Sequence, residues 1–214
     1  MPMAEDFDTR DGLLHRRSFV HMTVAALASF VAGSAYAQGP QKAGVVESIR
    51  GEGFAETGRA RRNLQHDAPV FIADRVSTGA NSRLTIHLGQ QTRVRLGERA
   101  RITVDRFLVN AGGDLKLESG AVFFEQPPGG KPSRVRIRSA FGLIAVRGTR
   151  FFAGPSAGVF GVFVERGSVA VRAAGKQVIV RAGEGTNIRR PGAAPTPPAP
   201  WGQPRIDAAL NSVF

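Results

Sequence analysis

From Ala43 onward, hydrophobic and polar residues alternate along the chain with a period of two. Successive side chains of a β-strand point to opposite faces, so this pattern predicts strands with one buried face and one polar face. No ten-residue window between residues 43 and 190 shows the hydrophobic stripe of a helix. The alternation is clearest in the segments 84–88, 94–96, 102–104, 115–117, 135–137, 169–171 and 178–180.

Glycines separate these segments at a spacing of about ten residues, which is typical of a sandwich, a barrel or a strand-stacking solenoid. No strict repeat is present, and this argues against an ideal solenoid. We therefore expect an all-β domain over residues 38–188, with short stacked strands in a twisted two-sheet or irregular solenoid-like arrangement.

The last 26 residues have a different pattern. Residues 189–204 are rich in proline and predict a linker. Residues 205–214 place Ile206, Leu210, Val213 and Phe214 on one face of a short C-terminal amphipathic helix. A helix of about ten residues is not stable alone in water, so we expect it to dock on the β-domain.

Residues 1–37 have the order of a bacterial export signal. Arg16 and Arg17 precede an apolar stretch without charged residues, and Ala35-Tyr36-Ala37 forms an A-x-A cleavage site. The paired arginines resemble a twin-arginine signal. We expect cleavage after Ala37, a periplasmic or secreted protein, and no membrane span in the mature chain. The alternative is a retained membrane anchor.

The charge of the chain is strongly positive, at +12. Without residues 1–37, 26 Lys and Arg face 13 Asp and Glu. Such a surface favours an anionic partner. An exported protein rarely meets nucleic acid, so we expect none. The chain has no cysteine, which excludes disulfides and thiolate metal sites.

Arginines occupy alternate positions within two predicted strands, and each set therefore lies on one face. Bidentate guanidinium groups suit carboxylates and phosphates, so these positions are candidates for binding an anionic envelope polymer or another envelope protein. The alternative is a solvated face that keeps sheet edges from pairing. The candidates are Arg93, Arg95, Arg134, Arg136 and Arg138.

A charge, a glycine and a hydroxyl interrupt the apolar stretch FGLIAVRGTRFFA at residues 141–153. Gly148 permits backbone angles that other residues resist, so we expect a sharp turn or bulge between two strands. We expect Thr149 to satisfy a backbone group at this corner and Arg147 to hydrogen-bond loop carbonyls.

Five segments in order, at 45–51, 74–84, 146–151, 164–169 and 182–184, resemble the FecR domain family. Residues 146–151 look like its V-R-G-T-x-F signature, and 74–84 like its D-x-V-x-T-G-x-x-S-x-A/L segment. Arg166 is inserted before the glycine of V-x-E-G-x-V. The matching signature positions are Val146, Arg147, Gly148, Thr149, Phe151, Glu165, Gly167, Gly183 and Glu184.

The resemblance implies an extracytoplasmic all-β module that binds or acts as a scaffold without catalysis, as part of envelope signalling. Longer family members are anti-sigma regulators with a cytoplasmic sigma-binding segment and one membrane helix. Here 15 residues precede the twin arginines, too few for a folded segment of that kind. A membrane-anchored component of a sigma-factor pathway is an alternative.

No motif for catalysis, a metal or a cofactor is present, so we expect no enzyme and no cofactor. His66 and His87 do not form a zinc-binding pair, and no G-x-S-x-G elbow occurs. The remaining alternative is an envelope carbohydrate-active enzyme whose two carboxylates meet only in the folded chain.

Overall fold

The alternating segments are β-strands in the computed structural model of the protein. Leu84, Ile86 and Leu88 of one such segment are at most 1% exposed, as the period of two predicts. The structure describes residues 39–108, 112–127, 134–146 and 148–214. The predicted export signal and Arg147 lie outside the described residues.

The strands form two nine-stranded sheets. Sheet A has the order β18 (Ala199–Pro200), β17 (Glu184–Ile188), β14 (Val159–Arg166), β13 (Arg150–Ser156), β10 (Val122–Glu125), β7 (Thr92–Leu96), β6 (Arg83–Leu88), β1 (Lys42–Arg50) and β4 (Pro69–Phe71). Sheet B has the order β16 (Lys176–Arg181), β15 (Ser168–Ala173), β12 (Gly142–Val146), β11 (Arg134–Ser139), β9 (Gly112–Ser119), β8 (Arg101–Leu108), β5 (Arg75–Thr78), β2 (Gly53–Thr57) and β3 (Ala60–Asn63).

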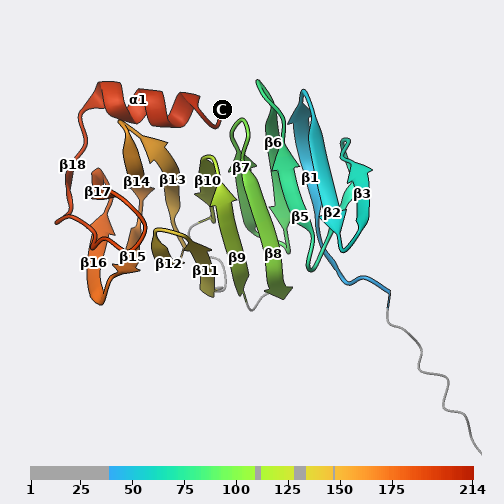
Figure 1. Ribbon diagram of the computed structural model, residues 1–214, viewed down its shortest axis with the longest axis horizontal. Coiled ribbons are helices and arrows are strands. Elements are labelled where there is room, and N and C mark those ends of the chain that lie inside the picture. Colours follow the sequence, from blue (N-terminus) through green and yellow to red (C-terminus); the bar gives the residue numbers. More distant parts are fainter. Residues whose placement is uncertain (1–38, 109–111, 128–133, 147) are drawn as a thin grey trace, which may run out of the picture. The chain divides into compact units, whose positions relative to one another are not determined.

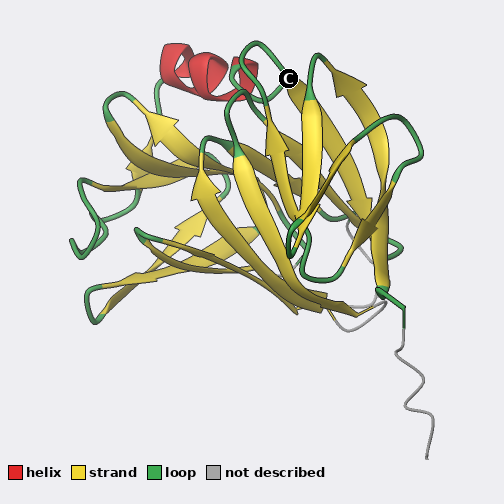
Figure 2. Cartoon of the chain, turned by 45° about the vertical axis from the view of Figure 1, so that its right-hand side comes forward, coloured by secondary structure: helices red, strands yellow, loops and turns green. Residues whose placement is uncertain are grey.

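The chain passes repeatedly from one sheet to the other. The hairpin β6–β7 lies in sheet A, β8–β9 in sheet B, and β13–β14 again in sheet A before β15–β16 in sheet B. The inward faces of both sheets share one hydrophobic core. Figures 1 and 2 show the two layers of strands. The described strands close no barrel, and the predicted all-β two-sheet fold is confirmed.

One pair of neighbouring strands, β9 and β11, is parallel, while the other described pairs are antiparallel. Between these two strands the chain leaves sheet B, forms β10 in sheet A and returns. Parallel neighbours require a crossover connection of this kind, because a tight hairpin reverses the chain direction.

Three strands of sheet A have a hydrophobic area on their outer face as well, and the C-terminal helix α1 (Gln203–Asn211) covers it. Phe123 of β10, Phe152 of β13 and Phe163 of β14 lie beneath this cover, and each is at most 3% exposed. Ala209 of α1 is 3% exposed and packs in the same cluster. Figure 2 shows the helix outside the strand layers.

The Pro-rich segment before α1 lies along β17. Its Thr196 hydroxyl accepts a hydrogen bond of 3.1 Å from the Asn187 amide, and Trp201 stacks on Phe163 with 5.3 Å between ring centroids. A side chain at Gly185 would place its Cβ 2.2 Å from the Trp201 indole nitrogen, so only glycine fits here. In the described part of the chain, no helix is long and apolar enough to cross a membrane.

Candidate functional site

The V-R-G-T-x-F signature lies where the chain crosses from sheet B to sheet A. Val146 ends β12 and is 4% exposed, and Phe151 in β13 is fully buried in the core. Gly148 lies between the two strands with a φ of +62°, in the left-handed region that favours glycine. The sharp turn predicted at Gly148 is confirmed.

Gln126, which follows β10, joins this corner to two other strands of the domain, β7 and β14. Its side-chain oxygen accepts a hydrogen bond of 3.1 Å from the Gly148 amide, and its nitrogen donates one of 3.0 Å to the Thr92 hydroxyl. Its backbone amide donates to the Thr149 carbonyl, and its carbonyl accepts from Arg166 at 2.6 Å. Gln126 is 4% exposed. The local sequence gives no sign of this role, because the partners of Gln126 come from distant strands.

The Thr149 side chain has a different role from the one predicted. Its hydroxyl is buried and has no hydrogen-bond partner among the described residues. The prediction that it bonds a backbone group at the corner is therefore wrong. The methyl group instead faces Gly167, where an added Cβ would lie 2.8 Å away. Gly167 also has a φ of +86°. Two signature segments of the family are therefore in direct contact.

The earlier signature segments also meet each other in the structure. A Cβ at Gly51 would lie 2.4 Å from the Ser82 hydroxyl, so the 45–51 and 74–84 segments approach each other closely. Asp74 is fully buried and accepts hydrogen bonds from the Phe71 amide at 2.7 Å and from Arg62. These signature positions hold turns and crossings in place.

The closing A-G-E segment connects the ends of both sheets. The Gly183 amide donates a hydrogen bond of 2.8 Å to the carbonyl of Val164 in sheet A. The Glu184 carboxylate accepts one of 2.9 Å from the amide of Arg181 in sheet B. These contacts, too, serve the fold.

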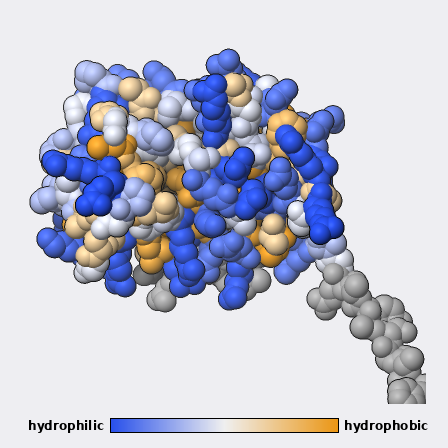
Figure 3. Space-filling view, in the orientation of Figure 1, coloured by the Kyte–Doolittle hydropathy of each residue, from blue (hydrophilic) through white to orange (hydrophobic). Residues whose placement is uncertain are grey.

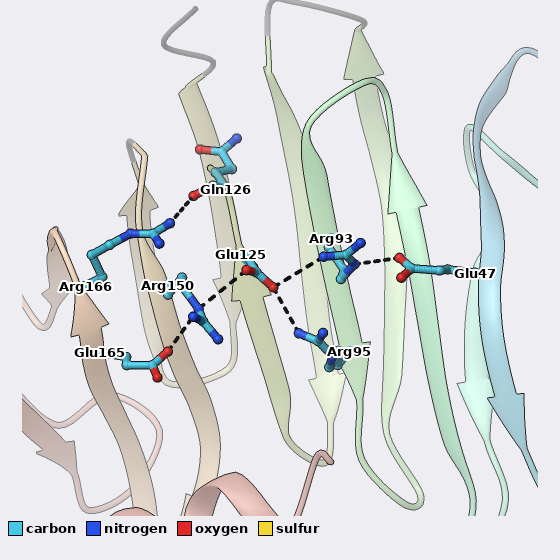
Figure 4. A network of polar contacts seen from close by, with 8 residues as sticks. All are labelled: Glu47, Arg93, Arg95, Glu125, Gln126, Arg150, Glu165 and Arg166. Atoms are coloured by element: carbon cyan, nitrogen blue, oxygen red, sulfur yellow. Dashed lines mark hydrogen bonds and ion pairs between the residues drawn. The ribbon is translucent and has the colours of Figure 1, made fainter. Parts of the chain in front are cut away.

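A chain of ion pairs crosses the outer face of sheet A (Figure 4). Arg93 on β7 lies 2.5 Å from the Glu47 carboxylate on β1 and 3.6 Å from Glu125 on β10. Arg150 on β13 continues the chain, at 3.5 Å from Glu125 and 3.0 Å from Glu165 on β14. Each of these carboxylates has an arginine beside it.

Glu125 lies at the centre of this chain of ion pairs. Partial burial raises the pKa of its carboxyl group, but the hydrogen bond from Arg95, at 3.1 Å, and the charges of Arg150 and Arg93 outweigh that effect. The pKa of Glu125 therefore lies below its ordinary value. The pKa of Arg93 is raised, chiefly by its hydrogen bond to Glu47.

The predicted anion-binding arginines are divided between two outer faces. Arg93 and Arg95 lie on sheet A, and the other three lie on β11 of sheet B. Arg136 makes a bidentate contact with Asp114, at 2.6 and 2.8 Å, which raises the pKa of its guanidinium. Arg138 has no ion pair among the described residues, and the Arg134 side chain lies outside the description.

A group of exposed cations on sheet B has no carboxylate partner in the described part of the chain. We call it the basic patch, and it consists of Arg138, Arg172, Lys176 and Arg181. Ala145, Ala170 and Ile179 are neighbours on β12, β15 and β16 in the same part of sheet B. Arg172, Lys176 and Arg181 were not predicted as candidates, because nothing in their spacing shows which cations have carboxylate partners.

The molecular face seen in Figure 3 is mostly hydrophilic, with small separate hydrophobic areas. A cavity of about 350 Å³ lies beside the β1–β2 turn, lined by Ile49, Phe54, Leu64 and His66 among others. Glu52 supplies the one carboxylate of its lining, whereas glycoside hydrolysis uses a pair. The described residues contain no group of side chains that could hold a metal ion.

The two facing sheets, joined by repeated crossings, form one β-domain. The family model described as FecR protein matches residues 74–170, which confirms the resemblance over this part of the chain. No curated protein matches the sequence.

Two crystal structures of a candidate anti-sigma factor from Parabacteroides distasonis ATCC 8503, at 1.65 Å and 2.50 Å resolution, have a similar fold. Both align with a TM-score of 0.52 and 17% identity over 64% of this chain. The match spans 64% and 63% of those two chains, so about a third of each lies outside it.

Proposed function

We propose that the protein is an exported, non-catalytic FecR-type module that acts by binding in an envelope pathway that controls a sigma factor. The observation that carries this proposal is the FecR match at residues 74–170, on a fold shared with a candidate anti-sigma factor. The partner is an envelope component, either a protein or an anionic polymer.

The chemistry of the described side chains supports binding over hydrolysis. Glu47, Glu125 and Glu165 each lie beside an arginine, and the lowered pKa of Glu125 keeps it ionised at neutral pH. A glycoside hydrolase needs one carboxylic acid with a raised pKa as its proton donor. This network therefore favours the binding module over the carbohydrate-active enzyme.

Export is the second part of the proposal. The paired Arg16 and Arg17, the uncharged stretch that follows, and Ala35-Tyr36-Ala37 support transport and cleavage before Gln38. Retention of the apolar stretch would instead tether the same domain to the membrane, as an anchored component of the pathway.

The experiment compares transcripts of a strain that lacks the gene with those of the parent and of a complemented strain. We expect a set of genes with one shared promoter sequence to change, and complementation to restore it. An unchanged transcript profile together with an altered envelope glycan composition would contradict the proposal and favour the enzyme.

A further inference from the structure

The four strands at the ends of the two sheets differ in how well their free edges are protected. In sheet A, β4 has three residues and begins with proline, and β18 has two residues and ends with proline. In sheet B, β3 has four residues, and its Arg61 and Arg62 pair with carboxylates. Short strands, prolines and charges protect sheet edges from pairing. The fourth strand, β16, has six residues and no proline.

The outer edge of β16 carries the backbone groups of Gln177 and Ile179, which follows from the direction of the Arg181 amide. The Arg181 amide donates to Glu184 and so points away from the neighbouring strand β15. In an antiparallel strand, alternate residues direct their backbone groups to the same edge, which assigns Ile179 and Gln177 to that edge as well. No described strand pairs with it.

The centre of β16 also exposes a hydrophobic side chain. Ile179 is 41% exposed and is one of two large hydrophobic residues exposed among those described. The other, Phe214, is in contact with the rings and charges of its surroundings: its ring lies 5.2 Å from that of Phe123, and the Arg95 guanidinium lies 4.6 Å from its centroid. Ile179 has the apolar row of Ala170 and Ala145 beside it and solvent on its other side.

The charges around Ile179 select one kind of partner. Lys176 and Arg181 lie at the two ends of β16, and Arg172 lies opposite Gln177 on β15. A second copy paired antiparallel about Ile179 would place Gln177, and no carboxylate, opposite Arg181. An acidic strand would instead meet Arg172, which lies opposite Gln177, toward one end of β16 and Arg181 at the other.

We propose that the β16 edge accepts an acidic, extended segment of a partner protein as an added strand. This inference rests on the proposed function, namely that the protein acts by binding. The segment would carry acidic residues opposite Gln177 and Arg181 and a hydrophobic residue opposite Ile179. Main-chain hydrogen bonds supply affinity in such strand addition, and side chains supply selectivity.

The probe is a fluorescent peptide, Thr-Glu-Thr-Val-Thr-Glu-Thr, whose binding to the mature chain is measured by anisotropy. One control peptide has Lys in place of Glu, and another carries N-methyl groups on its Val and Glu residues. We expect both controls to bind at least about tenfold more weakly. Equal binding of the N-methylated peptide would overturn strand addition and leave a purely anionic interaction, such as one with a polymer. Equal binding of the peptide with Lys would show that acidic residues are not required, and would overturn the proposal of an acidic partner segment.

Variants of the protein, with the peptide unchanged, test the same edge. Ile179→Pro removes the outward amide, whereas Ile179→Ala keeps it, so the first should lose peptide binding and the second should weaken it less. Thermal melting checks that both are folded. Replacing Arg172, Lys176 and Arg181 with Gln should weaken binding about tenfold, since each exposed pair contributes little alone. The matched triple Arg50→Gln, Arg59→Gln, Arg101→Gln removes exposed arginines elsewhere and should leave binding unchanged.

The outcomes separate this inference from the proposed function. Peptide binding is measured on the purified chain and requires no transcript to change. If the acidic peptide does not bind the purified chain, but deletion of the gene still alters the transcripts of one promoter class, the inference is overturned and the proposed function is not. Concentration-dependent dimerisation of the mature chain that Ile179→Pro abolishes would assign the edge to a second copy, and would equally overturn it.

Discussion

Gly148 turns the chain between the two sheets with a φ of +62°. An added Cβ there meets no atom within 4 Å, so the cost of substitution comes from the backbone alone. Gly148→Val should destabilise the fold by about 1–3 kcal/mol. Gly148→Asn should cost less, because asparagine tolerates the left-handed region. Urea unfolding measures both, and equal stability of the Val variant and the wild type would refute the role of the turn.

Residues at this corner show which features the local sequence encodes. The turn at Gly148 was predictable, since a positive φ is a property of one residue. The packing of the Thr149 methyl group was not, because it depends on Gly167 from a later segment of the chain. Gln126 was equally hidden, since its hydrogen bonds reach Thr92 and Arg166 on other strands.

The strands of sheet A carry a set of charges whose stabilising effect depends on pH. The pKa of Glu125 is lower in the folded chain than its ordinary value of 4.5. Its ionised form therefore stabilises the fold above that pH, and the contribution is lost as the pH falls through the folded pKa. Glu125→Gln should lower stability by about 1–3 kcal/mol at pH 7, with the difference shrinking in acid.

Melting curves of the wild type and of Glu125→Gln between pH 3 and pH 7 test this expectation. Glu165→Gln serves as the control, because Glu165 has one arginine partner and its side chain is 39% exposed. Its effect should be smaller. A Glu125→Gln difference that stays constant across this range would show that the carboxylate charge does not stabilise the fold.

The helix α1 offers a pair of adjacent positions that test its docking. Ala209 is 3% exposed against the aromatic cluster, whereas Ala208 is exposed. Ala209→Asp buries a charge and should cost about 1–3 kcal/mol or more. Ala208→Asp should change stability by less than about 0.5 kcal/mol. Similar losses in chemical denaturation for both variants would contradict packing of this helix face.

At the scale of the elements, alternation predicted the strands and their buried faces well. It did not predict which strands share a sheet, because that depends on where the chain crosses between layers. Arg93 and Arg136 thus have equivalent local patterns but lie on different sheets, beside Glu47 and Asp114 respectively. These partners are 46 and 22 residues away, so the pairing could not be read from spacing.

Export is a prediction about the whole molecule. The mature chain should begin at Gln38, and changing Arg16 and Arg17 together to Lys should retain the protein in the cytoplasm if the twin-arginine route is used. N-terminal sequencing of periplasmic material checks the start. A chain that begins at Met1 and fractionates with membranes would show that the signal is retained.

The central claim is that the domain acts as a binding module outside the cytoplasm in sigma-factor signalling. The most direct measurement is the level of the affected transcripts in the deletion strain, complemented either with the full chain or with a chain that lacks residues 1–37. The account predicts that the full chain restores the parental level and that the leaderless chain, at equal abundance, does not. Restoration by the leaderless chain would contradict the account.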